Sequence, residues 1–296
     1  MDTRLNYNKS LKRNIYDRLF TILAGIFACI STLPLILVLG YVIIKGGSQI
    51  NWDILILEPL PPGDDLGSAG GIGNAIIGTL IISSIASLIS IPIGVGGGVY
   101  LAEYSKDGKF AKFIRFGINV LSGVPSIIAG VFIYAVIVVT KILWGSMYSG
   151  LAGGIALSIL MLPSVIKTTD EGLKLVPDEL RKGALGVGAS MFTTVTRVTL
   201  PNASKSILTG IVLGLARAAG ETAPLIFTAL FSRYYITGIG DLFYEMGSLS
   251  VLIYNFALEP YEAQNQLAWS ASFVLVLMIF SLSMLSKLIS KFAINK

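Results

Sequence analysis

Long apolar runs constrain this chain more than any other feature of its sequence. A transmembrane helix needs about 20 consecutive apolar residues, and six stretches reach that length between polar loops. Inside lipid the backbone must satisfy its own hydrogen bonds, which favours helices for runs of this length. The sequence therefore predicts an all-α, polytopic membrane protein with six transmembrane helices, at about residues 19–44, 75–102, 113–140, 148–167, 206–231 and 268–290.

The composition agrees with a lipid environment and narrows the chemistry. Of the 296 residues, 54% are hydrophobic and 13% are charged, whereas soluble domains have about 25% charged residues. There is no histidine, and Cys29 is the single cysteine, so a disulfide within the chain is excluded and a zinc or iron site is disfavoured. The phosphate-binding P-loop motif is also absent, so any ATP must bind to another polypeptide.

Basic residues alternate from loop to loop along the chain. They gather in residues 1–18, after the second span, in residues 168–205 and near the C-terminus. Because cytoplasmic loops carry the excess of Lys and Arg, we expect cytoplasmic tails at 1–18 and 291–296, around a transmembrane domain at 19–290 with a cytoplasmic loop at 168–205. The basic residues outside this pattern are Lys45, Lys141, Arg217 and Arg233.

The cytoplasmic loop 168–205 contains a predicted short amphipathic helix. Pro177 followed by two acidic residues is typical of a helix start, and Leu180, Ala184 and Val187 then recur at helical spacing. The helix is expected at about residues 178–190. Such a helix can dock in the groove of a partner or lie on the membrane surface, and the spacing alone does not decide between these.

The same segment resembles the EAA signature of ABC importer permeases. Residues 180–189 read LRKGALGVGA, with Leu-Pro at 200–201. Ala184 and Gly188 fall in register with that signature, whereas Lys182 and Gly183 replace its Glu and first Ala. The resemblance implies that this is the coupling helix, which inserts into the ATPase subunit. The residues expected at that contact are Leu180, Ala184, Val187 and Gly188.

The fifth apolar run contains a charged pair. An arginine at that depth costs about 2.5–3.5 kcal/mol on insertion scales, so we expect Arg217 to face the interior of the bundle with a partner. Glu221 lies one helical turn further on and can pair with it. Gly210 and Gly214 should let another helix approach closely. The pair could meet a substrate oxyanion, which the planar fork of arginine suits, act as a gate, or only lock two helices together.

Proline and glycine residues predict where helices break or pack. Pro224 cannot donate to the carbonyl of Gly220, so a kink is expected beside the charged pair. Pro125 and Pro163 predict breaks in the third and fourth spans. Because transporters build many substrate sites at broken helices, Gly220, Thr222, Pro224 and Pro125 are expected at or near the pathway.

A glycine-rich stretch in the second apolar run is predicted to allow close helix packing. Gly94, Gly96, Gly97 and Gly98 lie inside the second apolar run and not between a strand and a helix. This context is wrong for a dinucleotide-binding loop, so the glycines are predicted to bring helices together.

Residues 216–225, ARAAGETAPL, are similar to the hallmark of the PstA family, permeases of phosphate-specific ABC importers. Segments 70–80, 100–104 and 122–127 agree with the same family, so the resemblance covers most of residues 70–230. The paired permease of that system, PstC, has a related Arg-x-x-Gly-Glu-Thr with different residues after it, and the Ala-Pro ending favours PstA. The resemblance implies a type I ABC importer permease fold.

The resemblance also implies a function and a set of partners. The chain would move inorganic phosphate inward across the lipid bilayer of a bacterial plasma membrane, without catalysing a reaction or holding a cofactor or metal. Its partners would be a second permease, two ATPase subunits with ATP and Mg, and an extracytoplasmic phosphate-binding protein, with no nucleic acid. The alternatives are transport of sulfate or molybdate, the role of the paired phosphate permease, an ion-coupled carrier that works alone, and a role in phosphate signalling.

Overall fold

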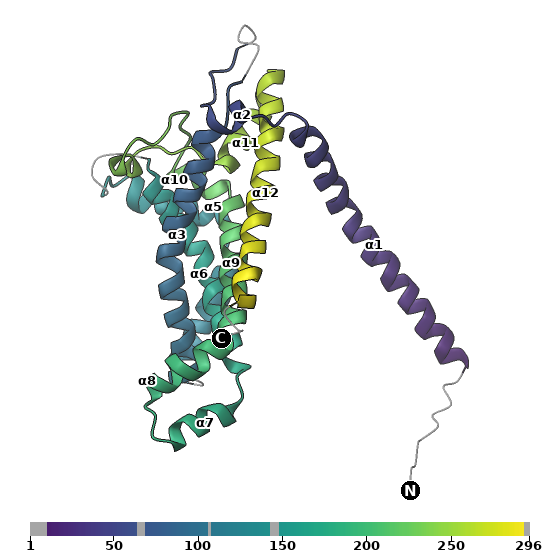
Figure 1. The fold of residues 1–296 in the computed structure, drawn as a ribbon, viewed down its shortest axis with the longest axis vertical. Coiled ribbons are helices and arrows are strands. Elements are labelled where there is room, and N and C mark those ends of the chain that lie inside the picture. Colours follow the sequence, from purple (N-terminus) through teal and green to yellow (C-terminus); the bar gives the residue numbers. More distant parts are fainter. Residues whose placement is uncertain (1–10, 64–68, 106–107, 143–147, 293–296) are drawn as a thin grey trace.

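The computed structural model describes residues 11–63, 69–105, 108–142 and 148–292 (Figure 1). The outermost parts of the two predicted tails, 1–10 and 293–296, lie outside these ranges. The helical elements are α1 (Leu11–Gly47), α2 (Trp52–Ile56), α3 (Gly73–Val99), η2 (Tyr100–Tyr104), α4 (Lys109–Gly123), α5 (Ser126–Ile133), η3 (Tyr134–Val138), α6 (Gly150–Lys174), α7 (Asp178–Gly186), α8 (Met191–Thr194), η4 (Val195–Thr199), α9 (Leu200–Gly220), α10 (Ala223–Thr228), η5 (Ile239–Phe243), α11 (Leu249–Ala257) and α12 (Glu262–Phe292).

The all-α prediction is confirmed, and the fifth span differs most from the expected one. Five helical segments are long and apolar enough to cross a membrane, and a sixth span results if α4 and α5–η3, bent by 101°, are counted as one. The bend lies at Val124 and Pro125, as the proline predicted. The predicted fifth span, 206–231, is wrong in its bounds, because the long helical segment runs over Met191–Gly220.

Helix α6 lies between α3 and α9 and packs closely on both. A Cβ atom at Gly94 of α3 would lie 2.6 Å from Cγ1 of Val165, and one at Gly98 would overlap the side chain of Thr169. These two glycines therefore do what the sequence predicted and bring α3 against α6. Pro163 lies inside α6, which continues through it, so the predicted break there is wrong.

Gly210 makes a testable contact between α6 and α9. A Cβ atom there would overlap the side chain of Thr168, so Gly210→Ala should lower the free energy of unfolding by about 1–3 kcal/mol, as overpacking does. The matched control is Gly96→Ala in α3, where no atom lies within 4 Å of the added Cβ and alanine favours the helix. Stability of the purified chain against denaturing detergent would measure both, and equal effects would contradict the packing.

The first helix leaves the bundle. Figure 1 shows α1 slanting away from the other helices and touching α12 only near its own C-terminal end. There Tyr41 packs edge-on against Trp269, with ring centroids 4.9 Å apart, and Gly46 lies against the backbone of Trp269. None of the most apolar window of α1 is buried in the chain. Its surface is therefore left for lipid or another chain to cover.

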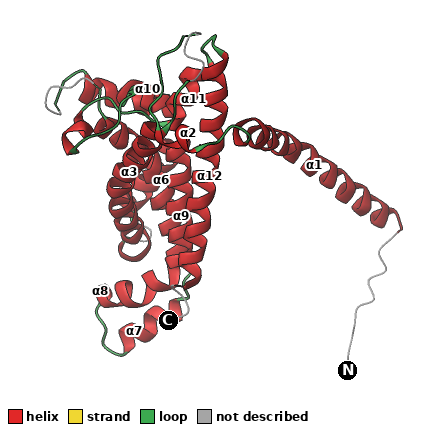
Figure 2. Cartoon of the chain, turned by 45° about the horizontal axis from the view of Figure 1, so that its top comes forward, coloured by secondary structure: helices red, strands yellow, loops and turns green. Residues whose placement is uncertain are grey.

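The two ends of the bundle are built differently. Helices α7 and α8 project from one end, the end at which α12 also finishes, whereas α2, α11 and the longer loops lie at the other end (Figure 2). The segment that leads into α3 and the segment between α10 and α11 meet there. Asn74 donates to the carbonyl of Ser232 at 2.7 Å, and the backbone N–H of Tyr235 donates to Glu58 at 2.6 Å.

Candidate substrate path and coupling helix

Helix α9 stops before the proline that was expected to kink it. The helix ends at Gly220, Glu221 is extended with φ −75° and ψ 127°, and α10 begins at Ala223. Pro224 therefore sits in the first turn of α10, where a missing N–H costs nothing. It is buried against α5, because a Cβ at Gly130 would lie 2.5 Å from Cα of Pro224. The predicted break is present, as a full interruption and not as a kink.

A serine of α11 braces the interruption. Oγ of Ser250 donates to the carbonyl of Glu221 at 3.0 Å, and Oγ1 of Thr222 donates to the carbonyl of Ser250 at 3.5 Å. A carbonyl released by a helix end needs such a partner when it is away from water. No pattern in the sequence pointed to Ser250, which lies outside the six predicted spans.

The charged pair forms as predicted, but its surroundings differ. Nε of Arg217 lies 3.2 Å from Oε1 of Glu221, and the side chains are 55% and 18% exposed. The expectation that Arg217 faces the interior of this chain's own bundle is therefore wrong. The buried stripe of α9 runs through Gly210, Gly214 and Ala218, which face α6, and Arg217 lies beside that stripe on the helix surface.

Arg217 opens into a cavity of about 320 Å³ between α9, α6 and the end of α4. Of the predicted pathway residues, Arg217 lines this cavity, whereas Glu221, Pro125 and the residues of the interruption are not among its lining residues. Guanidinium and ammonium groups with nearby hydroxyls can bind a tetrahedral oxyanion. The lining residues are Leu121, Ser122, Leu160, Pro163, Ser164, Lys167, Thr168, Glu171 and Arg217.

A second cavity continues toward the end that holds α7. It measures about 310 Å³ and shares Lys167 and Glu171 with the first. Its far wall contains Arg115, Asp170 and Lys174. From the sequence, Arg115 and Lys174 counted only as basic loop residues and Asp170 did not stand out, because spacing along one helix does not show which other helix completes a cavity.

The short helix predicted in the loop 168–205 is present, and apolar side chains on and beside it are exposed. Helix α7 begins at Asp178, directly after Pro177 as predicted, and ends at Gly186, earlier than the expected 178–190. Gly188, with φ +87°, turns the chain into α8, which only glycine does without strain. Leu180 and Val187 are exposed, Val187 by 86%, and Ala184 is partly exposed.

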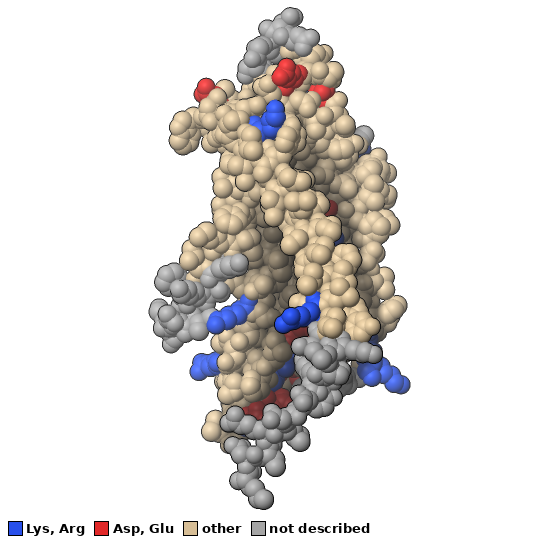
Figure 3. Space-filling view, turned by 90° about the vertical axis from the view of Figure 1, so that its right-hand side faces the viewer, with Lys and Arg blue, Asp and Glu red and all other residues tan. Residues whose placement is uncertain are grey.

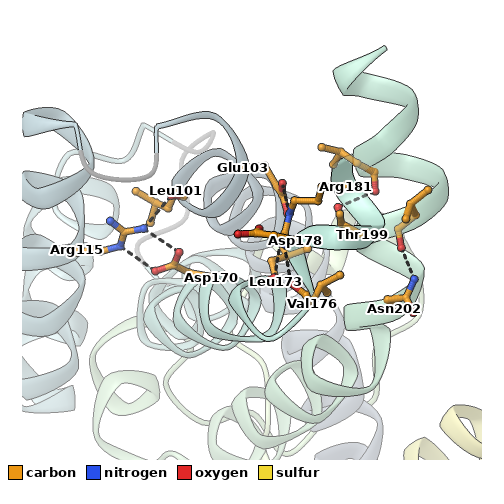
Figure 4. Close-up of polar contacts among 12 residues, drawn as sticks. Leu101, Glu103, Arg115, Asp170, Leu173, Val176, Asp178, Arg181, Thr199 and Asn202 are labelled. Carbon is orange, nitrogen blue, oxygen red and sulfur yellow. Dashed lines mark hydrogen bonds and ion pairs between the residues drawn. The ribbon is translucent and has the colours of Figure 1, made fainter. Parts of the chain in front are cut away.

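One buried arginine fastens α7 to the bundle (Figure 4). The guanidinium of Arg181 donates to Glu103 from Nη2 at 2.8 Å and from Nε at 3.1 Å. It also donates to the carbonyls of Leu173 and Val176, both at 2.6 Å, and to Asp178 at 3.0 Å. The hydrogen bonds to the Glu103 carboxylate raise the pKa of Arg181 above its ordinary value. In the sequence, Glu103 stood out only as part of segment 100–104, which resembles the PstA family, and no spacing pointed to its partner.

A second ion network lies beside the first (Figure 4). Arg115 of α4 donates to both oxygens of Asp170 at 2.9 Å and to the carbonyl of Leu101 at 2.8 Å. Lys174 also donates to Asp170 at 2.8 Å. Arg115 thus joins α4 to α6 and to η2, the turn that also contains Glu103.

Basic residues are concentrated toward one end of the molecule. On the face drawn in Figure 3, most Lys and Arg side chains lie toward the end with α7, whereas acidic side chains are seen at both ends. Within the described residues, no group of three or more Cys, Asp or Glu side chains could hold a metal ion.

Known proteins resemble this chain in sequence and in fold. The phosphate transport system permease protein PstA of Pasteurella multocida is 37% identical over 85% of this chain and 86% of its own. PstA of Haemophilus influenzae is 36% identical over 93% and 94% of the two chains. Among solved structures, a bacterial ABC transporter involved in the import of the acidic polysaccharide alginate covers 96% of this chain and 98% of its own, with 15% identity and a TM-score of 0.64.

These comparisons confirm the resemblance from the motifs and the ABC importer permease fold. The similarity to PstA proteins extends over far more of the chain than residues 70–230. Residues 94–294 match the family described as binding-protein-dependent transport system inner membrane component. The chain is therefore a multi-pass inner-membrane component of an ABC importer, and it belongs to the PstA family of phosphate transport system permeases.

Proposed function

We propose that this chain moves inorganic phosphate inward across the bacterial plasma membrane, driven by ATP hydrolysis on separate subunits. The observation that supports this most is Arg217, paired with Glu221 at a broken helix and opening into a cavity that also contains Lys167. The PstA relatives named above make phosphate the anion to expect. Arg217 would bind the phosphate oxygens, and Glu221 would hold the guanidinium when no anion is present.

The exposure of Arg217 supports the need for a second permease. A charge that is half exposed on one chain cannot face lipid without a large cost. A similar permease packed against this face would enclose the cavity and complete a path between the two chains. The uncovered surface of α1 offers further apolar area to such a partner.

The other partners follow from the two ends of the molecule. The basic end with α7 would face the cytoplasm, together with both termini, and receive two ATPase subunits that hold ATP and Mg. The opposite end would face an extracytoplasmic phosphate-binding protein. ATP and Mg would thus act on partner chains and not on this one.

Selectivity separates phosphate from the other oxyanions. Cells with the complete complex should take up radioactive phosphate at a rate that a tenfold excess of sulfate or molybdate leaves unchanged and unlabelled phosphate abolishes. Suppression by sulfate or molybdate would instead assign the permease to that anion.

Because the ATPase is proposed to dock on α7, a charge placed at the C-terminal end of α7 should weaken ATPase binding strongly. Val187→Glu places a carboxylate on its exposed apolar surface, and the amount of ATPase subunit that copurifies with the permease should fall at least tenfold. Ile239→Glu is the matched control, since Ile239 is equally apolar and exposed but lies at the opposite end. Unchanged copurification of Val187→Glu would show that the ATPase binds elsewhere.

A further inference from the structure

The contact between Arg181 and Glu103 is more complete than an anchor for a surface helix requires. The Glu103 side chain is fully buried and that of Arg181 is 11% exposed. A guanidinium has five N–H donors, and all of those of Arg181 find acceptors on Glu103, Asp178 and two carbonyls. A planar, fully bonded guanidinium holds its partners in one orientation.

Arg181 also joins three separate parts of the chain. Among the described residues it makes the side-chain hydrogen bonds that link α7 to the membrane helices. Its acceptors include the carbonyl of Leu173 in α6, the carbonyl of Val176 just after α6, and the carboxylate of Glu103, which belongs to the π-helical turn η2 that follows α3. Isolated π-helical turns are frequent at functional sites.

The turn η2 continues the link toward the substrate cavity. The carbonyl of Leu101 in the same turn accepts a hydrogen bond from Arg115 of α4. Further along α4, Leu121 and Ser122 line the cavity that contains Arg217. The ion pair between Arg181 and Glu103, the hydrogen bond from Arg115 to η2 and the helix α4 therefore connect α7 to the cavity.

We propose that Arg181 and Glu103 form a strut that transmits movement of α7 to η2 and α4. The strut rests on the proposed function, since it assumes that the ATPase moves α7. Arg181 and Glu103 are positioning residues and do not touch phosphate. Closure of the ATPase would shift α7, and the buried ion pair would pull η2 with it, because uncoupling the two would leave the buried Glu103 carboxylate without its partner.

The test compares docking with transport. Arg181→Met keeps the length of the side chain but loses its donors, and Lys205→Met makes a matched change at an exposed basic residue of α9, outside the helix proposed to dock the ATPase. For each complete complex in proteoliposomes we would measure ATPase copurification, the rise in ATP hydrolysis caused by phosphate-loaded binding protein, and phosphate uptake. Arg181→Met should keep ATPase copurification within twofold of wild type but lose the rise in hydrolysis and at least 90% of uptake. Lys205→Met should behave as wild type.

A double variant separates a strut from a purely structural pair. Two apolar side chains of similar volume often replace a buried ion pair without loss of stability, so Arg181→Met with Glu103→Met should assemble normally. The strut predicts that uptake stays below a tenth of wild type in this assembled complex. Restored uptake in the double variant, normal uptake in Arg181→Met, or failure of both variants to assemble would each overturn the strut. Absence of phosphate uptake by the wild-type complex would instead overturn the proposed function.

Discussion

Arg217→Ala should abolish phosphate uptake while the permease still inserts and assembles. The guanidinium lines the cavity and is half exposed, so its removal leaves no hole in the packed core. It does remove the planar donors that can hold a phosphate oxyanion. Loss of one such donor group in a preorganised site costs on the order of 100-fold or more in rate. Uptake of radioactive phosphate by cells, corrected for the amount of permease in the membrane, would measure the effect.

Two further variants make this result interpretable. Lys205→Ala removes an exposed cation from the other end of the same helix and should leave uptake within twofold of wild type. Arg217→Lys keeps the charge but loses the fork of parallel donors, so its uptake should lie between those of wild type and Arg217→Ala. Uptake by Arg217→Ala close to that of wild type would mean that the charged pair only locks the interrupted helix.

Asp170→Ala should destabilise the end of the bundle that carries α7 by about 3 kcal/mol, near the lower end of the range for breaking a buried ion pair. Asp170 is buried and accepts from both Arg115 and Lys174. Its removal leaves two cations side by side, although Lys174 can turn toward water and reduce the cost. The midpoint of unfolding of the purified chain in denaturing detergent would report the change.

Glu171→Ala is the matched control for that experiment. It removes a carboxylate from the next residue of α6, which is exposed and forms no ion pair among the described residues. Surface changes of this kind usually alter stability by less than about 0.5 kcal/mol. Equal destabilisation by the two variants would mean that the network around Asp170 contributes little.

The sequence predicted the elements better than their contacts. The length of the apolar runs and the distribution of Lys and Arg predicted the spans, because the bilayer imposes both on any helix that crosses it. Pro125 marked the sharp bend between α4 and α5, and Pro177 marked the start of α7. In contrast, Pro163 left α6 continuous, since neighbouring helices can compensate for a missing hydrogen bond.

The sequence predicted only the part of the site that depends on local spacing. Arg217 and Glu221 are one turn apart, so a local rule was enough to pair them. Arg181 and Glu103 are far apart in the sequence, and only the packing of η2 against the end of α6 brings them together. Exposure of Arg217 depends on what lies beside the chain, which helical spacing within one chain does not report.

Phosphate should pass through this permease only as part of an ATP-driven complex. Proteoliposomes would contain either this chain alone or the complete complex with the second permease and the ATPase, with phosphate-loaded binding protein on the outer side. We expect accumulation of phosphate only in the complete complex with ATP inside. Accumulation by this chain alone, or by the complete complex without ATP, would contradict ATP-driven transport and indicate an ion-coupled carrier.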